Sequence, residues 1–122
     1  MLPARHRLRE SADFTSAVRG PGSSRAGGRL IVVHANRTDA RTDCPPRVGF
    51  VVSKAVGNAV VRNTTKRRLR AILASQVSGI PLGFDLVVRA NPAAAGAAFA
   101  ELEAAVATQL PRVTQTSRVP AS

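Results

Sequence analysis

The side chains with the clearest chemistry lie in one basic segment near the middle of the chain. Five of them share an arc of about 140° when a helix is drawn at about 100° per residue. They are Arg62, Asn63, Lys66, Arg67 and Arg70. Like charges on neighbouring turns repel by roughly a few tenths of a kcal/mol, and no acidic residue between Asp43 and Asp85 offsets them. Because phosphates would neutralise these charges, the pattern predicts a face that docks on a nucleic acid. There the Asn63 amide suits a sugar hydroxyl, a base edge or a neighbouring backbone group.

The composition of the whole chain points to the same class of partner. Its 18 basic residues outnumber the 7 acidic ones, for a formal net charge of +11, which favours a polyanion. The chain offers only two His as bases at neutral pH and no spaced cluster of carboxylates, so we predict no catalytic residue and no metal site. The lone Cys44 fits a reducing compartment, and no apolar run predicts a membrane span. We expect a cytoplasmic protein without a membrane or small-molecule partner.

Periodicity predicts the elements that hold the basic face in place. Ser11 is expected to cap a short helix, and helical spacing returns over residues 59–74 and 94–110, where Phe99 shares the apolar stripe and Pro111 ends the helix. β-Branched segments predict strands over residues 29–35, 47–53 and 84–89. The loop between the first two strands permits antiparallel pairing, and residues 25–28 have the composition of a loop.

Together these elements predict an α+β fold in one domain. We expect a small two-layer α/β sandwich with helices packed on a mostly antiparallel sheet, in the order α-β-β-α-β-α, with a possible extra short strand. Residues 1–10 form a basic, extended N-terminal arm, residues 11–110 the RNA-binding domain, and residues 111–122 a disordered tail. Gly49 is expected to permit close approach to its strand, and Gly57 with Asn58 to begin the basic helix.

Residues 53–70 read SKAVGNAVVRNTTKRRLR and closely resemble the signature of the bacterial ribonuclease P protein component. The Arg-Asn-x-x-Lys-Arg-x-x-Arg core of that signature is complete at residues 62–70. Further similarity occurs in family order at Arg7-Leu8, Asp13-Phe14, residues 47–49 and residues 85–88, so the resemblance covers about residues 3–110.

The resemblance implies both a topology and a function. Family members have a left-handed crossover between parallel strands, whereas such crossovers are normally right-handed. The protein joins a catalytic RNA in a 1:1 complex that hydrolyses one phosphodiester and so removes the 5′ leader from precursor tRNA. The RNA subunit carries the catalysis, and Mg²⁺ is held mainly by RNA phosphates, with none assigned to the protein.

The resemblance also implies which residues meet each RNA. The arc residues named above, with Arg68 beside them, match the face that binds the catalytic RNA. A cleft between helix and sheet guides the single-stranded leader, and four positions match it: Phe14, His34, Ser53 and Lys54. The chain departs from the family pattern at Val18 and His34, where aromatic residues are common, and at Ala55, where Lys is frequent.

Each of these residues also has an ordinary structural interpretation. The basic arc can be a solvated helix face, and Asn63 can orient the start of its helix. Phe14 can be a core residue, His34 a strand residue facing solvent, and Lys54 a charge at a strand end.

Three other functions compete with the one that the resemblance implies. A ribosomal protein or RNA chaperone would share the charge and size. A helix-turn-helix DNA regulator would need a short helix just before the basic one, where a strand and a turn are expected instead. A self-sufficient nuclease would need acid, base and metal-binding residues that the sequence does not supply.

Overall fold

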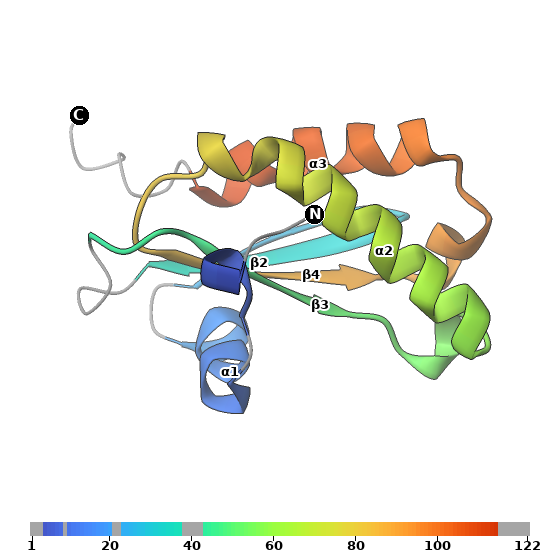
Figure 1. The fold of residues 1–122 in the computed structure, drawn as a ribbon, viewed down its shortest axis with the longest axis horizontal. Helices are drawn as coiled ribbons and strands as arrows, with labels where there is room; N and C mark the ends of the chain where they lie inside the picture. The colour runs from blue at the N-terminus through green and yellow to red at the C-terminus, as the bar shows by residue number, and fades with distance from the viewer. Residues whose placement is uncertain (1–3, 9, 21–22, 38–42, 115–122) are drawn as a thin grey trace.

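The computed structural model describes residues 4–8, 10–20, 23–37 and 43–114, which form a four-stranded sheet with helices on both faces (Figure 1). The strands are β1 (Ser24–Gly27), β2 (Ile31–Arg37), β3 (Arg47–Val51) and β4 (Phe84–Ala90). The α-helices are α1 (Ser11–Arg19), α2 (Ala59–Gln76) and α3 (Phe99–Thr114). Short 3₁₀ turns are η1 (Ala4–His6), η3 (Lys54–Val56), η4 (Val77–Gly79) and η5 (Pro92–Gly96). The α+β fold class is confirmed.

The central strand of the sheet is β4, and this placement corrects the predicted pairing. The strand order is β1-β2-β4-β3, with β4 antiparallel to β2 and parallel to β3. The expected antiparallel pair of β2 with β3 is therefore wrong. Residues 84–88 are buried on both faces, which is typical of a strand at the centre of a sheet that is covered on both sides.

The parallel pair of β3 and β4 requires a crossover, and α2 provides it. In Figure 1 the chain runs along β3 at the near edge of the sheet, rises to α2 and returns along β4 behind it. Traced along the strand direction, this path is left-handed. The hand agrees with what the resemblance implied.

A fourth strand, β1, occupies the segment for which the sequence predicted a loop. Its residues are small or polar and have little intrinsic strand preference. It forms because a tight turn, in which Gly28 N–H donates to the Ile31 carbonyl (3.0 Å), brings it antiparallel to β2. Ala26 is then buried beneath α3.

The two faces of the sheet are covered to different extents, which modifies the predicted two-layer arrangement. On one face α2 and α3 pack over a large core that includes Val33, Leu86 and Leu69. On the other face α1 covers a smaller cluster of Ala17 and Val87. On the α1 side the central strands also bury polar side chains, such as His34 and Asp85, so this face does not form a second large apolar core.

Local capping fixes the start of α2 as predicted. The Asn58 side chain accepts a hydrogen bond from Val61 N–H at 3.0 Å, which satisfies one of the free donors of the first turn. Gly57 has φ of 156°, and a Cβ atom there would lie 2.8 Å from Val61 Cγ1. Both predictions at this turn are confirmed.

The ends of the other helices differ from the predictions. Glu10 precedes α1 as its N-cap residue, and Ser11 is the first helical residue rather than the cap. Pro111 lies inside α3, which continues to Thr114 because Val113 is buried in the core. Phe99 is 42% exposed and does not share the buried stripe. Residues 115–122 of the predicted tail lie outside the described residues.

Part of the predicted N-terminal arm is docked on the sheet. A 3₁₀ turn, η1, replaces the extended chain expected there. Leu8 is buried, and its N–H donates to the Val48 carbonyl at 3.0 Å, while the His6 ring bonds to the Pro46 carbonyl at 2.7 Å. The arm therefore covers part of the outer edge of β3.

Candidate nucleic-acid interface

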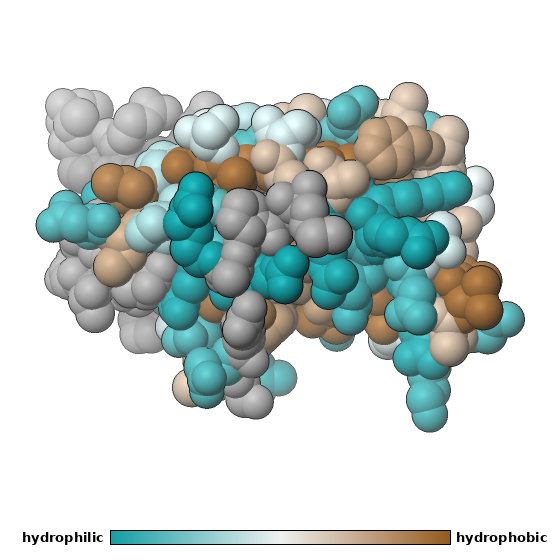
Figure 2. Space-filling view, in the orientation of Figure 1, coloured by the Kyte–Doolittle hydropathy of each residue, from teal (hydrophilic) through white to brown (hydrophobic). Residues whose placement is uncertain are grey.

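The basic arc lies on the side of α2 that faces away from the core. The buried side of the helix lies next to the arc and consists of Thr65, Leu69, Ile72 and Leu73. Every predicted arc residue retains exposure: Asn63, Arg67 and Arg70 are exposed, and Arg62 and Lys66 are partly exposed. Figure 2 shows hydrophilic side chains gathered along this helix.

The charges of the arc are not compensated within the described part of the chain. No acidic side chain there forms an ion pair with Arg62, Lys66, Arg67 or Arg70. The Arg62 Nε–H is buried and lacks a hydrogen-bond acceptor among the described residues. Since an unpaired buried donor is costly, this face suits an anionic partner.

Arg68 lies apart from the arc. Its guanidinium donates to the Ala97 carbonyl at 3.2 Å and so ties α2 to the end of η5. This position is about 240° around the helix from Arg62. Contact of Arg68 with RNA stays a prediction.

Arg47 belongs to the acid-free stretch of the sequence, yet the fold neutralises its charge. Its Nε and one terminal nitrogen donate to the two Asp85 oxygens at 2.9 and 2.8 Å, and the other terminal nitrogen lies 3.2 Å from Asp13. The hydrogen bond to Asp85 raises the pKa of Arg47, against the opposing effect of burial. Arg47 therefore joins β3, β4 and α1 rather than adding to a one-signed surface.

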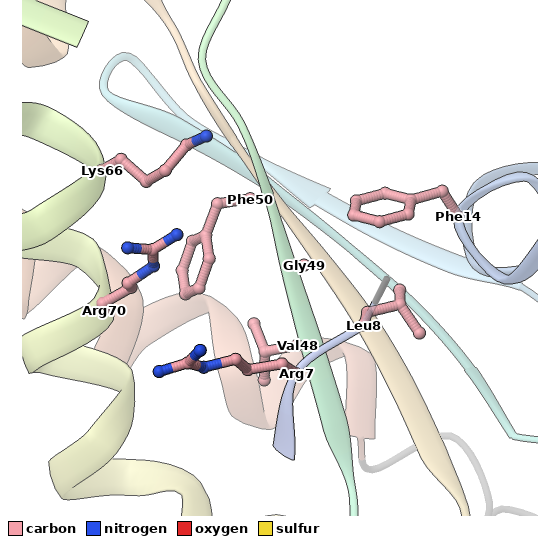
Figure 3. A pocket seen from close by; sticks show the side chains of 8 residues that line it. All are labelled: Arg7, Leu8, Phe14, Val48, Gly49, Phe50, Lys66 and Arg70. Carbon is pink, nitrogen blue, oxygen red and sulfur yellow. The ribbon is translucent and has the colours of Figure 1, made fainter. Parts of the chain in front are cut away.

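A cavity of about 300 Å³ at the edge of β3 connects the arc with the α1 side of the sheet. In Figure 3, Arg7, Lys66 and Arg70 extend toward the same space beside the Phe50 ring, and Phe14 reaches β3 from the other side. The structure thus brings two predicted arc residues near one predicted cleft residue. Arg7 and Phe50 were not predicted as site residues.

Phe14 packs directly on Gly49, which confirms that this glycine permits a close approach. A Cβ atom at Gly49 would overlap the Phe14 ring and lie 3.1 Å from Leu8 Cβ. Phe14 is half-buried among the residues of the smaller cluster and also borders the cavity. It combines a packing role with one accessible edge.

His34 lies on the face of the sheet that α1 partly covers, and it is only 7% exposed. The alternative of a strand residue facing solvent is therefore wrong. A cavity of about 150 Å³ beside it has six lining residues: Val18, Arg19, His34, Val51, Val87 and Arg89. Burial lowers the pKa of His34, and the charges of Arg25 and Arg89 lower it further.

The remaining two predicted cleft residues lie away from His34. Strand β3 ends at Val51, two residues earlier than expected, so Ser53 and Lys54 occupy the exposed turn before α2. Neither lines the cavity at His34.

Sequence reasoning missed the arginines around His34 because two of them come from distant strands. Register places Arg25 of β1 opposite His34. Arg89 of β4 is two residues from Val87, the other partner of His34, and so lies on the same face of the sheet. Recognition of β1 as a strand would have identified Arg25.

The described residues contain neither a candidate metal site nor a candidate membrane span. Among residues 4–8, 10–20, 23–37 and 43–114, no group of three His, Cys, Asp or Glu is placed to hold a metal ion. No helix in the same ranges is long and apolar enough to cross a membrane.

The fold and the uncompensated cationic helix define a small α/β protein with a surface suited to a nucleic acid. Comparison with known proteins is more specific. A family model described as Ribonuclease P matches residues 2–114. The ribonuclease P protein component of Acidothermus cellulolyticus is 51% identical over 117 residues, covering 95% of this chain and 94% of the relative. That of Kocuria rhizophila is 54% identical over 116 residues, covering 92% and 98%.

Solved structures lead to the same family. The ribonuclease P protein of Thermotoga maritima superposes with a TM-score of 0.74 at 26% identity, covering 89% of this chain and 98% of that one. The Staphylococcus aureus protein gives 0.72 at 27% identity, covering 93% and 96%. The chain belongs to the family of ribonuclease P protein components, the protein part of a tRNA-processing endoribonuclease.

Proposed function

We propose that this chain binds the catalytic RNA of ribonuclease P through α2 and the 5′ leader of precursor tRNA through the α1 side of its sheet. In this role it assists endonucleolytic removal of the leader, while the RNA performs the chemistry. The observation that carries the proposal is the uncompensated cationic face of α2, formed by the signature residues of the family.

The electrostatics of α2 support contact with a highly charged RNA. With Arg68 tied to Ala97, four cations remain on the arc. If each neutralises one phosphate, log K falls by about 0.7 to 0.9 per contact for each tenfold rise in salt. A fourfold rise in salt then weakens binding by about two powers of ten.

The α1 side of the sheet supports contact with a single strand. Phe14 presents an edge to the cavity beside β3, and stacking of a base on an aromatic ring contributes about 1 to 3 kcal/mol. His34 occupies a second, smaller cavity on the same side. A strand crossing between them would meet the arc of α2 at Lys66 and Arg70, which line the first cavity, and would leave Arg62, Asn63 and Arg67 to the larger RNA.

The proposal assigns catalysis and metal binding to the RNA partner. Mg²⁺ is held mainly by RNA phosphates, and the protein contributes cations that reduce repulsion between RNA segments. The expected assembly is one protein with one catalytic RNA in the cytoplasm.

The structure disfavours one competing function directly. A helix-turn-helix regulator places a helix immediately before its recognition helix, whereas here β3 and η3 precede α2. An assay of leader cleavage distinguishes the proposed function from that of a ribosomal protein or an RNA chaperone.

The test is reconstitution with a bacterial catalytic RNA that matches this family. At low Mg²⁺ the chain should accelerate removal of the leader from precursor tRNA. Cleavage by the RNA alone at high Mg²⁺ shows that the RNA is active. No acceleration at low Mg²⁺ would reject the proposal, and Mg²⁺-dependent cleavage by the protein without RNA would show a self-sufficient nuclease.

A further inference from the structure

The cavity between α1 and the sheet is lined by a histidine. His34 is 7% exposed, borders the cavity of about 150 Å³, and its ring forms no hydrogen bond within the described part of the chain. Neither ring nitrogen is sealed from this space. A buried polar ring of this kind is normally paired, so its nitrogens are available to a ligand.

Basic groups surround this histidine on three elements. Arg19 of α1 and Arg89 of β4 line the cavity, and Arg25 of β1 lies opposite His34 in the strand register. The elements packed on His34 otherwise present apolar side chains, Val18, Val51 and Val87.

The nearest acidic groups do not neutralise the cavity. Asp85 is on the same face of β4, and Asp13 is on α1, but both carboxylates contact the Arg47 guanidinium, at 2.8 and 3.2 Å. The cavity therefore combines two lining arginines, a third arginine whose charge acts on His34, and apolar walls around a histidine ring without a hydrogen bond among the described residues. Such a combination suits an anion of the size of one phosphate group.

We propose that the cavity binds a phosphate group and that His34 takes up a proton when the phosphate enters. The ligand is a phosphodiester of the single-stranded leader, so this inference rests on the proposed function. A free oxyanion such as sulfate shares the same chemistry and is the second source to be tested.

The two charge states of His34 interact differently with a phosphate. In the empty cavity the lowered pKa keeps the ring neutral near pH 7, with one N–H donor and one acceptor nitrogen. A phosphate oxygen is repelled by the acceptor nitrogen and attracted by a second N–H. Phosphate binding therefore raises the pKa of His34, and affinity must fall as pH rises through the pKa of the bound state.

The change in affinity with pH depends on how far binding raises the pKa of His34. A rise of about one pKa unit on binding corresponds to about tenfold weaker affinity at high pH than at low pH. A phosphodiester keeps its single charge throughout, so the protein alone titrates. An aromatic residue at this position would instead stack on a base and give no such dependence.

The experiment is an NMR titration of the two histidines in the full chain. It is carried out alone, with a single-stranded oligoribonucleotide of leader length, and with sulfate. We expect the oligonucleotide and sulfate to raise the pKa of His34 by about one unit. His6, whose ring bonds to the Pro46 carbonyl on the outer edge of the sheet, is followed in the same spectra to separate a general effect of the ligand from an effect on His34.

Two variants separate a ligand role from a packing role. His34→Phe should retain oligonucleotide binding but lose the roughly tenfold pH dependence. Arg89→Gln changes an exposed side chain, and it should raise the pKa of His34 in the free protein while weakening the binding of both ligands. Arg112→Gln on α3, across the sheet, is the matched control and should change neither quantity.

An unchanged His34 pKa with both ligands would overturn the proposal, as would undiminished pH dependence in His34→Phe. A response to sulfate without a response to the oligonucleotide would overturn the leader assignment. These readouts need no catalytic RNA, so they are independent of reconstituted leader cleavage. If the protein accelerates cleavage but neither ligand changes the pKa of His34, the proposed function is supported and this further inference is wrong.

Discussion

Replacement of Arg67 and Arg70 by Gln should reduce the salt dependence of binding to the catalytic RNA. Both side chains are exposed on the arc of α2, and neither forms an ion pair within the described ranges. Gln keeps helix propensity close to that of Arg, so α2 should remain intact. The double variant therefore removes charge with little change in the fold.

The magnitude follows from the number of contacts. Four arc cations predict a slope of log K against log salt of about −3, and the double variant should reduce it by about 1.5. Two matched variants provide the comparison. Arg112→Gln on α3 should leave the slope unchanged, and Arg68→Gln should mainly lower stability, by about 1 kcal/mol, through the lost bond to Ala97.

The assay is equilibrium binding of fluorescent catalytic RNA across a series of salt concentrations, with protein stability measured in parallel by urea denaturation. An unchanged slope in the double variant would refute the assignment of this helix face. An equal reduction in Arg112→Gln would show that the net charge of the chain, rather than the face of α2, determines binding.

Three further substitutions test the packing around the site and the cleft. Gly49→Ala forces the Phe14 ring off β3 and should destabilise the fold by about 1 to 3 kcal/mol in urea denaturation; unchanged stability would contradict the close contact. Asp85→Asn leaves the largely buried Arg47 guanidinium with a weakened partner and should cost about 2 to 3 kcal/mol in the same measurement, whereas a loss below about 0.5 kcal/mol would show that the pair is merely superficial. Phe14→Ala should lower the preference for precursor over mature tRNA by about tenfold in competition binding, and equal losses for both tRNAs would exclude contact of Phe14 with the leader.

The parts of the fold that the sequence predicted well are those with local causes. Helix α2 follows from its capping residue, its positive-φ glycine and the spacing of its buried residues, all within about twenty residues of chain. Strand β4 follows from the apolar residues Leu86, Val87 and Val88, flanked by Phe84. The family signature lies inside α2, so the most specific functional signal and the strongest local structure coincide.

The parts of the fold that the sequence did not predict depend on contacts between distant segments. Strand β1 has weak local preference and forms through pairing with β2 and cover from α3. The insertion of β4 between β2 and β3 is decided by burial on both faces. Arg47 lies in the stretch of sequence that has no acidic residue, but its partners Asp13 and Asp85 come from either side of that stretch.

The charges around His34 could not be predicted from the sequence for the same reason. The sequence identified the position through the resemblance, but the charge around it depends on strand register and on the placement of α1. Arg19 and Arg89 line the cavity with His34, and the charge of Arg25 acts on His34 from β1. The sequence shows the histidine, but only the assembled sheet shows the arginines around it.

The most direct test of the central claim is to map what α2 touches in the assembled complex. An iron chelate attached at Asn63→Cys, in a chain carrying Cys44→Ser, should cut the catalytic RNA at a few neighbouring sites. The same chelate at Arg112→Cys, across the molecule on α3, should not cut those sites. Absence of cleavage from position 63, or the same pattern from both positions, would contradict docking of the catalytic RNA on α2.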